Sequence, residues 1–242
     1  MNSEELAHGS PVTGPEPGLP GLHLSCPPDP IVVQQRVDEV RTKVTAMGRD
    51  PEEVRIVAVT KGFTGAAVRA ALSAGISDIG ENYSNELLAK AHSLGSSEAR
   101  WHYLGAVQRR HVRTLSPAVS VWQGVCRQVE GDSIAASSPG AKIFVQVDIT
   151  GLPGRRGCAP DAAPGLVEYF GSIGLEVRGL MGMGPGGGPA ESRPGFRALA
   201  DLNRAIGLPE LSMGMSDDMD VALSEGSTML RLGRYLFGSR SG

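Results

Sequence analysis

The chain has 242 residues and a formal net charge of −3, with 40% hydrophobic and 20% charged residues. This balance is typical of a soluble globular protein and excludes one held on nucleic acid by bulk positive charge. Three cysteines without CxxC spacing exclude a full disulfide framework, and no apolar run reaches the roughly 18 residues of a membrane span. The acidic, proline-rich start is unlike a secretory signal, so we expect a cytoplasmic protein without a membrane partner.

The predicted elements begin after a tail. Residues 1–28 are rich in Pro and Gly and are predicted to be disordered, which leaves one domain over 29–242. Apolar periodicity then predicts helices at 31–47, 64–75, 84–94, 163–173, 193–207 and 217–226. The first of these helices would bury Val32, Val33, Val37, Val40 and Val44. Strands are predicted at 54–61, 76–83, 100–107, 119–125, 141–150, 175–183, 209–215 and 228–238.

Strands separated mostly by helices indicate a parallel β/α fold. A doubly wound sheet and a closed barrel both fit this alternation. About eight strands in a chain of this length favour a single (β/α)8 barrel, with an extra helix before the first strand.

Lys61 ends the first predicted strand, "VRIVAVTK". Side chains alternate along a strand, so Lys61 shares one face with Arg55, Val57 and Val59. Barrel active sites lie at the carboxyl ends of the strands, which places this lysine at the mouth of the barrel. A lysine amine attacks carbonyls once partial burial lowers its pKa. The alternative is a strand-end lysine whose ammonium simply reaches solvent.

Several further stretches follow "VAVTK" in a fixed order. They are "GENYSNE" at 80–86, "WHYLGAVQ" at 101–108, "GLMGM" at 179–183, "LSMGMSDDMDVAL" at 211–223 and "GSTMLRLGRYLFGSR" at 226–240. Together they resemble the pyridoxal 5′-phosphate (PLP) homeostasis family of the YggS/PROSC type, over about residues 30 to 240. The resemblance implies a fold similar to the N-terminal barrel of alanine racemase, and a PLP carrier or buffer that affects vitamin B6 balance.

The resemblance also implies roles for the residues that meet the cofactor ring. Lys61 would hold PLP as a Schiff base. Arg231 would face the pyridine nitrogen and, because arginine stays charged, would keep that nitrogen unprotonated. The alternative for Arg231 is a solvated strand arginine. Asn82 would lie near the ring hydroxyl, although a turn-forming asparagine is an equal alternative.

A phosphate subsite is implied by the last two motifs. Ser216 would contact the phosphate, would only cap the following helix, or would do both. Asp217 and Asp218 would repel a phosphate that they faced, so we expect them to point away from it. Gly233 would let the backbone approach the phosphate. Arg234 stands where the family usually has Ser or Thr, so it either pairs with the phosphate or points outward.

Other residues remain open. His102 would reach the pocket or be a hydrogen-bonded core histidine, and Tyr83 would be core or pocket wall. The glycine-rich stretch 182–192 lacks the lysine and spacing of a P-loop and is predicted to be a loop. In the rim, "QRRH" at 108–111, and Gly124 with Cys126, depart from the usual family residues.

Three functions fit a reactive Lys61. The first is a PLP-binding carrier without robust turnover, which would be a monomer with PLP-dependent apoenzymes as candidate recipients and no metal. The second is an amino-acid racemase of low activity, since racemases with this barrel use a second domain that we expect to be absent here. The third is a Schiff-base aldolase, which leaves the last two motifs unexplained.

Overall fold

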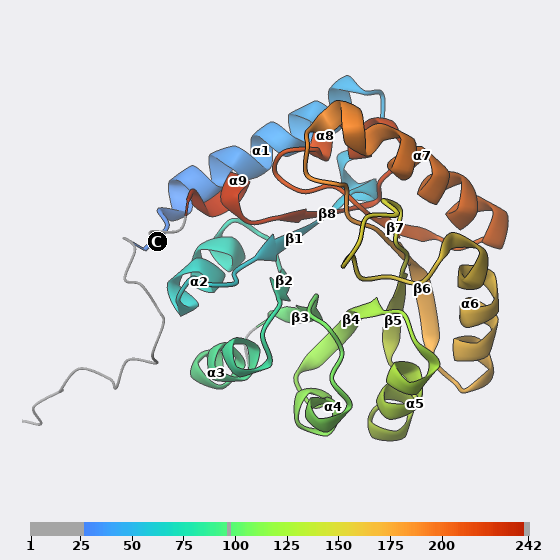
Figure 1. The fold of residues 1–242 in the computed structure, drawn as a ribbon. Coiled ribbons are helices and arrows are strands. Elements are labelled where there is room, and N and C mark those ends of the chain that lie inside the picture. The colour runs from blue at the N-terminus through green and yellow to red at the C-terminus, as the bar shows by residue number, and fades with distance from the viewer. Residues whose placement is uncertain (1–26, 96–97, 240–242) are drawn as a thin grey trace, which may run out of the picture.

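The computed structural model describes residues 27–95 and 98–239 (Figure 1). The predicted tail over residues 1–28 therefore lies almost wholly outside the described residues. The strands are β1 (Arg55–Val59), β2 (Asp78–Glu81), β3 (Arg100–Tyr103), β4 (Val119–Val125), β5 (Lys142–Gln146), β6 (Glu176–Met181), β7 (Glu210–Ser212) and β8 (Met229–Leu232). All neighbours pair in parallel, and β1 pairs with both β2 and β8, so the sheet is a closed barrel and the predicted fold is confirmed.

Helices ring the barrel on the outside (Figure 1). They are α1 (Pro30–Ala46), α2 (Gly65–Ser73), α3 (Ser84–Leu94), α4 (Arg109–Leu115), α5 (Gln128–Ser137), α6 (Ala163–Ser172), α7 (Pro189–Ile206), α8 (Met219–Ser224) and α9 (Arg234–Phe237). Short 3-10 turns lie at Pro51–Glu53 and Pro160–Ala162.

The extra helix α1 forms where the sequence predicts it. The carboxylate of Asp29 accepts a hydrogen bond of 2.9 Å from the backbone N–H of Ile31, which caps the first turn. The buried face carries the valines at 33, 37, 40 and 44, while Val32 is only partly buried. The helix packs against α2 and α9 and so covers the outside of the seam between β1 and β8.

Apolar side chains form two separate clusters. The larger one lies between the strands and the helices. The smaller one fills the barrel interior and comprises Val57, Val121, Phe144, Met181 and Met229. Alternation along each strand produces this division, since Ile56 and Ala58 pack in the outer cluster on either side of Val57.

The helices α4 and α5 lie in segments for which the sequence predicted no regular element. Each carries little apolar periodicity, because α4 buries only Val112 and Leu115 and α5 buries one large apolar residue, Ile134. Packing against the sheet forms these helices where local pattern does not predict them.

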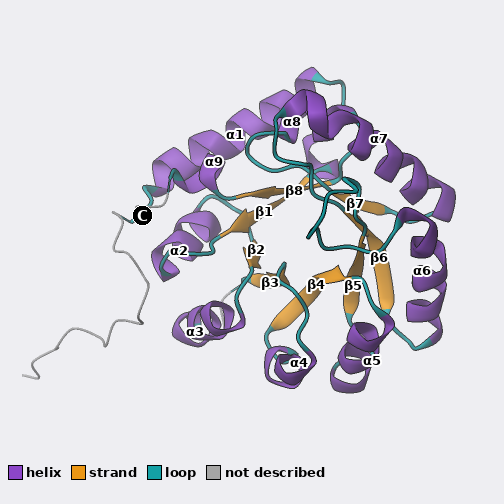
Figure 2. Cartoon of the chain, in the orientation of Figure 1, coloured by secondary structure: helices purple, strands orange, loops and turns teal. Residues whose placement is uncertain are grey.

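Several predicted strands were too long, and three of the wrong boundaries concern Lys61, Arg234 and the glycine-rich stretch. The strand β1 ends at Val59, and Lys61 lies in the turn that follows, where the N–H of Phe63 bonds back to the carbonyl of Thr60. The loop predicted over 182–192 ends at Gly188, because Pro189 occupies the first turn of α7, where its missing N–H costs no hydrogen bond. The last predicted strand is β8 followed by α9, so Arg234 begins a helix. Figure 2 shows the loops beside β6, β7 and β8 lying across the mouth of the barrel.

Candidate functional site

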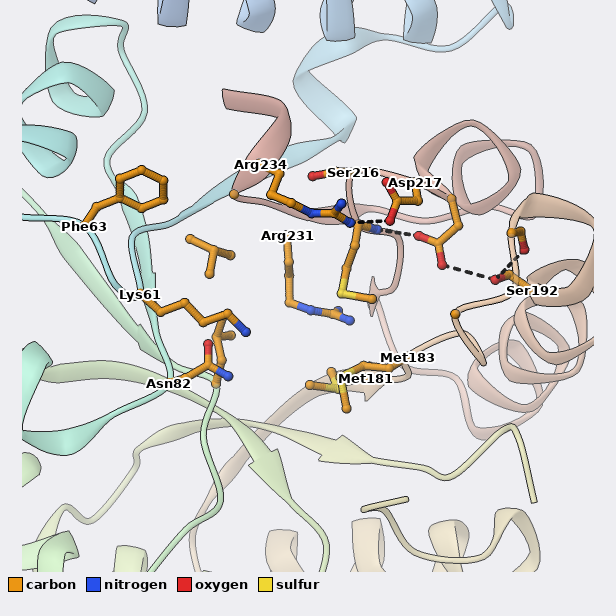
Figure 3. Close-up of a pocket in the computed structure, with 17 residues that line it drawn as sticks. Lys61, Phe63, Asn82, Met181, Met183, Ser192, Ser216, Asp217, Arg231 and Arg234 are labelled. Atoms are coloured by element: carbon orange, nitrogen blue, oxygen red, sulfur yellow. Dashed lines mark hydrogen bonds and ion pairs between the residues drawn. The ribbon is translucent and has the colours of Figure 1, made fainter. Parts of the chain in front are cut away.

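A cavity of about 450 Å³ opens at the carboxyl end of the barrel strands. This volume lies within the range of small-molecule sites. The six residues that the sequence analysis placed at one site all line it (Figure 3), namely Lys61, Asn82, Ser216, Arg231, Gly233 and Arg234. Closure of the barrel brings them together, because β1 lies between β2 and β8.

Lys61 is half-buried and its side chain extends along the cavity wall (Figure 3). Val57 faces the barrel interior and Val59 lines the cavity, so the predicted alternation holds up to Lys61 even though the strand has ended. Asn82 follows β2 and lines the same wall. A primary amine and an amide therefore enter the cavity from two neighbouring strands.

A buried ionic cluster lies behind the Lys61 turn. Lys90 on α3 is 5% exposed, and its ammonium donates to the carbonyl of Thr60 at 2.7 Å and to Glu86 at 3.1 Å. It also pairs with the fully buried Glu81. The hydroxyl of Thr60 donates to Glu81 at 2.7 Å, and the N–H of Gly62 donates to Glu86 at 2.8 Å. Both neighbours of Lys61 are thus fixed by side chains, which limits where the amine can lie.

Arg231 enters the cavity from β8 and is 4% exposed, so it is not the solvated strand arginine that its charge alone suggests. Its guanidinium donates to the hydroxyl of Ser212 at 2.7 Å and to the carbonyl of Gly182 at 2.8 Å. Burial lowers the pKa of Arg231 to about 10, and the charge of Asp218 opposes that shift. Arg231 is therefore still a cation at neutral pH and offers donors only.

Ser216 does not cap the following helix. The N-cap position of α8 is Asp218, and the Ser216 hydroxyl instead accepts a hydrogen bond of 3.0 Å from the N–H of Tyr235 in α9. Its own proton stays available to a ligand acceptor. Gly233 precedes α9, and a Cβ there would lie 3.1 Å from the carbonyl oxygen of Val59, so the chain passes close to the Lys61 turn at this point.

Arg234 pairs with Asp217, and both side chains are largely exposed at the cavity mouth, as Figure 3 shows. Arg234 therefore lines the cavity with its charge matched by a neighbouring carboxylate. Asp217 and Asp218 line the cavity as well, so the expectation that they point away from it was wrong. Asp218 differs, since its buried carboxylate accepts from the N–H of Met215 at 2.6 Å and from the hydroxyl of Ser192 at 3.2 Å.

Sequence analysis missed part of the cavity lining. Ser192 reaches it from the first turn of α7, which the sequence assigned to a loop. The apolar lining comprises Val59, Phe63, Leu104, Met181, Met183 and Met215. The "GLMGM" and "SMGM" motifs contain three of these residues, and methionines that flank a site motif were the available signal.

His102 and Tyr83 do not line this cavity. His102 is fully buried, with its ring nitrogens 2.8 Å from Asp78 and 2.7 Å from Gln123, so it is a hydrogen-bonded core histidine. Tyr83 is 56% exposed and belongs to neither core nor cavity wall.

One of the residues that depart from the family pattern, Gly124, has a steric explanation. A Cβ at Gly124 would lie 2.6 Å from the carbonyl oxygen of Gly105, so the chain there requires glycine. Cys126 is half-buried, and burial together with the charge of Glu130 raises the pKa of its thiol. Residues 109–111 of "QRRH" begin α4, and the hydroxyl of Ser84 lies 3.1 Å from Nδ1 of His111.

Within residues 27–95 and 98–239, no group of three or more His, Cys, Asp or Glu side chains is arranged to hold a metal ion. None of the helices in these ranges has the length and apolar character needed to cross a membrane.

Comparison with known proteins gives consistent relatives, although no protein-family model matches the chain. The chain is 36% identical over 209 residues to the pyridoxal phosphate homeostasis protein of Pseudomonas aeruginosa, covering 83% of this chain and 91% of that protein. It is 34% identical over 205 residues to the protein of the same name from Deinococcus radiodurans, covering 82% and 95%.

Solved structures agree with this. The structure of PipY from Synechococcus elongatus with PLP bound has a TM-score of 0.75 and 28% identity, covering 85% of this chain and all of that one. An unknown protein from Bifidobacterium adolescentis has a TM-score of 0.76 and 29% identity, covering 86% and 95%. The arginine decarboxylase of Paramecium bursaria Chlorella virus, at 14% identity and a TM-score of 0.67, shares the fold.

Proposed function

The chain belongs to the pyridoxal phosphate homeostasis protein family, and on this basis we propose that it binds PLP in the cavity at the barrel mouth. The observation that carries the proposal is that all six residues expected from sequence to hold the cofactor line this one cavity. PLP carries an aldehyde, a pyridine ring and a phosphate, and the cavity offers an amine, a buried cation, and a hydroxyl beside a second cation.

Lys61 is the proposed attachment point. Condensation of its amine with the aldehyde forms a C=N bond and releases the carbonyl oxygen as water. The ionic cluster of Thr60, Glu81, Glu86 and Lys90 fixes the turn from which the amine extends. A fixed turn reduces the conformational entropy that attachment costs.

Arg231 is proposed to meet the pyridine nitrogen. As a donor it favours an unprotonated nitrogen, and it cannot give up its own proton at neutral pH. An unprotonated pyridine is a weaker electron sink than a pyridinium, which suits holding PLP better than transforming amino acids. Asn82 is proposed to contact the ring hydroxyl from the β2 side.

The phosphate is proposed to lie against Ser216, Gly233 and Arg234. Ser216 has its hydroxyl proton to donate, and Gly233 presents backbone without a side chain. Arg234 lies at the mouth of the cavity, where a phosphate competes with Asp217 for its guanidinium. This arrangement replaces the hydroxyl that the family usually has at position 234 with a charge.

The wider role is proposed to be PLP homeostasis in the cytoplasm, as a monomeric carrier or buffer that supplies PLP-dependent apoenzymes without robust turnover of its own. A racemase would exchange the α-hydrogen of alanine or serine in D2O when loaded with PLP. The proposal expects no such exchange above that of free PLP, and measurable exchange would overturn the carrier assignment.

Mapping of the attachment point tests the binding proposal directly. The chain contains four lysines, Lys43, Lys61, Lys90 and Lys142. The protein would be incubated with PLP, reduced with borohydride, digested and analysed by mass spectrometry. We expect the pyridoxyl label on Lys61, unchanged in a Lys142→Ala control that removes an exposed lysine. Label confined to the other lysines would contradict the proposal.

A further inference from the structure

A continuous line of hydrogen bonds crosses the barrel interior from the cavity to the opposite mouth. Arg231 donates to Ser212 at 2.7 Å, and the Ser212 hydroxyl donates to Oε1 of Gln123 at 2.7 Å. Nε2 of Gln123 lies 2.7 Å from Nδ1 of His102, and Nε2 of that ring lies 2.8 Å from Asp78. We call these five residues the polar column. All are buried, and they come from five different strands, β8, β7, β4, β3 and β2.

The column occupies space that apolar side chains would otherwise fill. Trp101 and Tyr103 pack in the outer cluster, so His102 between them faces inward, beside the apolar interior cluster. Polar groups buried in this way cost free energy unless every one is hydrogen-bonded. In the column each of the five side chains has a hydrogen-bond partner, so the position of each one depends on its neighbours.

The hydrogen bonds of the column all point the same way. A guanidinium has donors only, so Ser212 accepts from Arg231 and directs its single proton to Gln123. The amide nitrogen of Gln123 then faces Nδ1 of His102, and it also lies 3.1 Å from the sulfur of Met229, a second acceptor. Nδ1 of His102 is thus an acceptor, and the ring carries its proton on Nε2, toward Asp78.

Asp78 anchors the far end of the column. Arg100 donates to both carboxylate oxygens, at 2.9 and 2.8 Å, and Arg55 lies 3.7 Å away. Burial alone would raise the pKa of Asp78, but hydrogen bonds from His102 and Arg100 and the charge of Arg100 hold it well below its usual value. The column therefore ends on a fixed carboxylate.

We propose that Ser212, Gln123 and His102 are positioning residues that hold the Arg231 guanidinium in the orientation in which it meets the pyridine nitrogen of PLP. The inference rests on the proposed function for its ligand. An arginine side chain has many rotamers, and the bonds to Ser212 and Gly182 select one of them. Because Ser212 is itself oriented by the residues below it, that selection depends on the whole column.

The column is tested first without PLP, by nitrogen-15 NMR of the histidine rings and of the arginine side-chain N–H groups. We expect His102 to carry one proton, on Nε2, at neutral pH, and the Arg231 signal to shift in Ser212→Ala. A proton on Nδ1 of His102, or an Arg231 signal that does not shift in Ser212→Ala, would contradict the hydrogen-bond pattern proposed for the polar column. Ser227→Ala is the matched control, since Ser227 is also fully buried but bonds only backbone groups of Met213, Leu211 and Met229.

The ligand part is tested by PLP titration of the same variants. Loss of one hydrogen bond to a charged group predicts about tenfold weaker PLP binding in Ser212→Ala and no change in Ser227→Ala. Equal binding by wild type and Ser212→Ala would overturn the positioning role. Failure of the wild type to bind PLP would instead contradict the proposed function. The NMR assignment of the His102 proton would still show whether the hydrogen bonds of the polar column form as described.

Discussion

The ammonium of Lys90 donates a hydrogen bond of 2.7 Å to the backbone carbonyl of Thr60, the residue before Lys61. Lys90 comes from α3, whereas Thr60 follows β1, so a helix fixes the turn that carries the proposed attachment residue. The same ammonium pairs with Glu81 and Glu86. Removing it leaves the buried Glu81 carboxylate with the Thr60 hydroxyl and one backbone N–H as partners.

A Lys90→Met substitution is therefore expected to lower the free energy of unfolding by about 3–5 kcal/mol, because it leaves the buried Glu81 carboxylate without a positively charged partner. The measurement is urea denaturation followed by circular dichroism. The double variant Lys90→Met/Glu81→Gln is the control, and we expect it to recover part of the loss. Equal stability of wild type and Lys90→Met would show that the ion pair does not stabilise this turn.

Acid should weaken the fold through Asp78. Its pKa in the folded state lies below the ordinary value of about 3.9. Its ionised form therefore contributes stability above that pH, and this contribution is lost as the pH falls through the folded-state pKa. We expect the free energy of unfolding to drop below about pH 4, and the drop to be smaller in Asp78→Asn. Asp201→Asn, at an exposed surface pair, is the control, and identical pH slopes in wild type and Asp78→Asn would contradict the assignment.

Arg234 is expected to act on the phosphate alone. Exposed charge pairs are worth up to about 1 kcal/mol, so Arg234→Gln should weaken PLP binding by up to about fivefold. Pyridoxal, which has no phosphate, should bind both forms equally. Asp217→Asn should strengthen PLP binding, because it removes the competing carboxylate. The control is Arg204→Gln on the exposed face of α7, and a parallel loss for pyridoxal would refute a phosphate role.

A substitution at Gly124 tests whether glycine is needed there for steric reasons. The close approach of the Gly105 carbonyl predicts that Gly124→Ser lowers the free energy of unfolding by about 1–3 kcal/mol, as overpacking does. Gly165→Ser in α6 is the matched control, since a Cβ there has no neighbour within 4 Å, and we expect it to be neutral or slightly stabilising. Equal stability of the two variants would mean that the chain around Gly105 relaxes freely.

The alternation of strand and helix predicted the barrel, because the longer elements show their own period clearly. The helices α4 and α5 escaped prediction because they are short or polar and are stabilised by packing against their neighbours. Boundaries such as the end of β1 at Val59 depend on a turn bonded to Glu86, 24 residues further along the chain, which local pattern does not contain.

That six residues line one cavity could be predicted, because the motifs that contain them resemble those of a family. Their spatial partners could not. Ser216 looked like a helix cap, yet it bonds to Tyr235 of α9, which packs beside it only in the folded chain. His102 was recognised as a candidate core histidine, but its neighbours in the column lie on four other strands. Asp78 and Gln123 lie on the two strands that pair with β3, whereas closure of the barrel brings Ser212 of β7 into line with them.

The most direct test of the account is the visible absorbance of the purified protein titrated with PLP, compared between wild type and Lys61→Ala. A Schiff base between a lysine and PLP gives a visible band that free PLP at the same concentration does not match. We predict a saturable band in the wild type that is absent in Lys61→Ala and unchanged in Lys142→Ala. A band of equal size in Lys61→Ala, or none in the wild type at saturating PLP, would contradict the proposed attachment at Lys61.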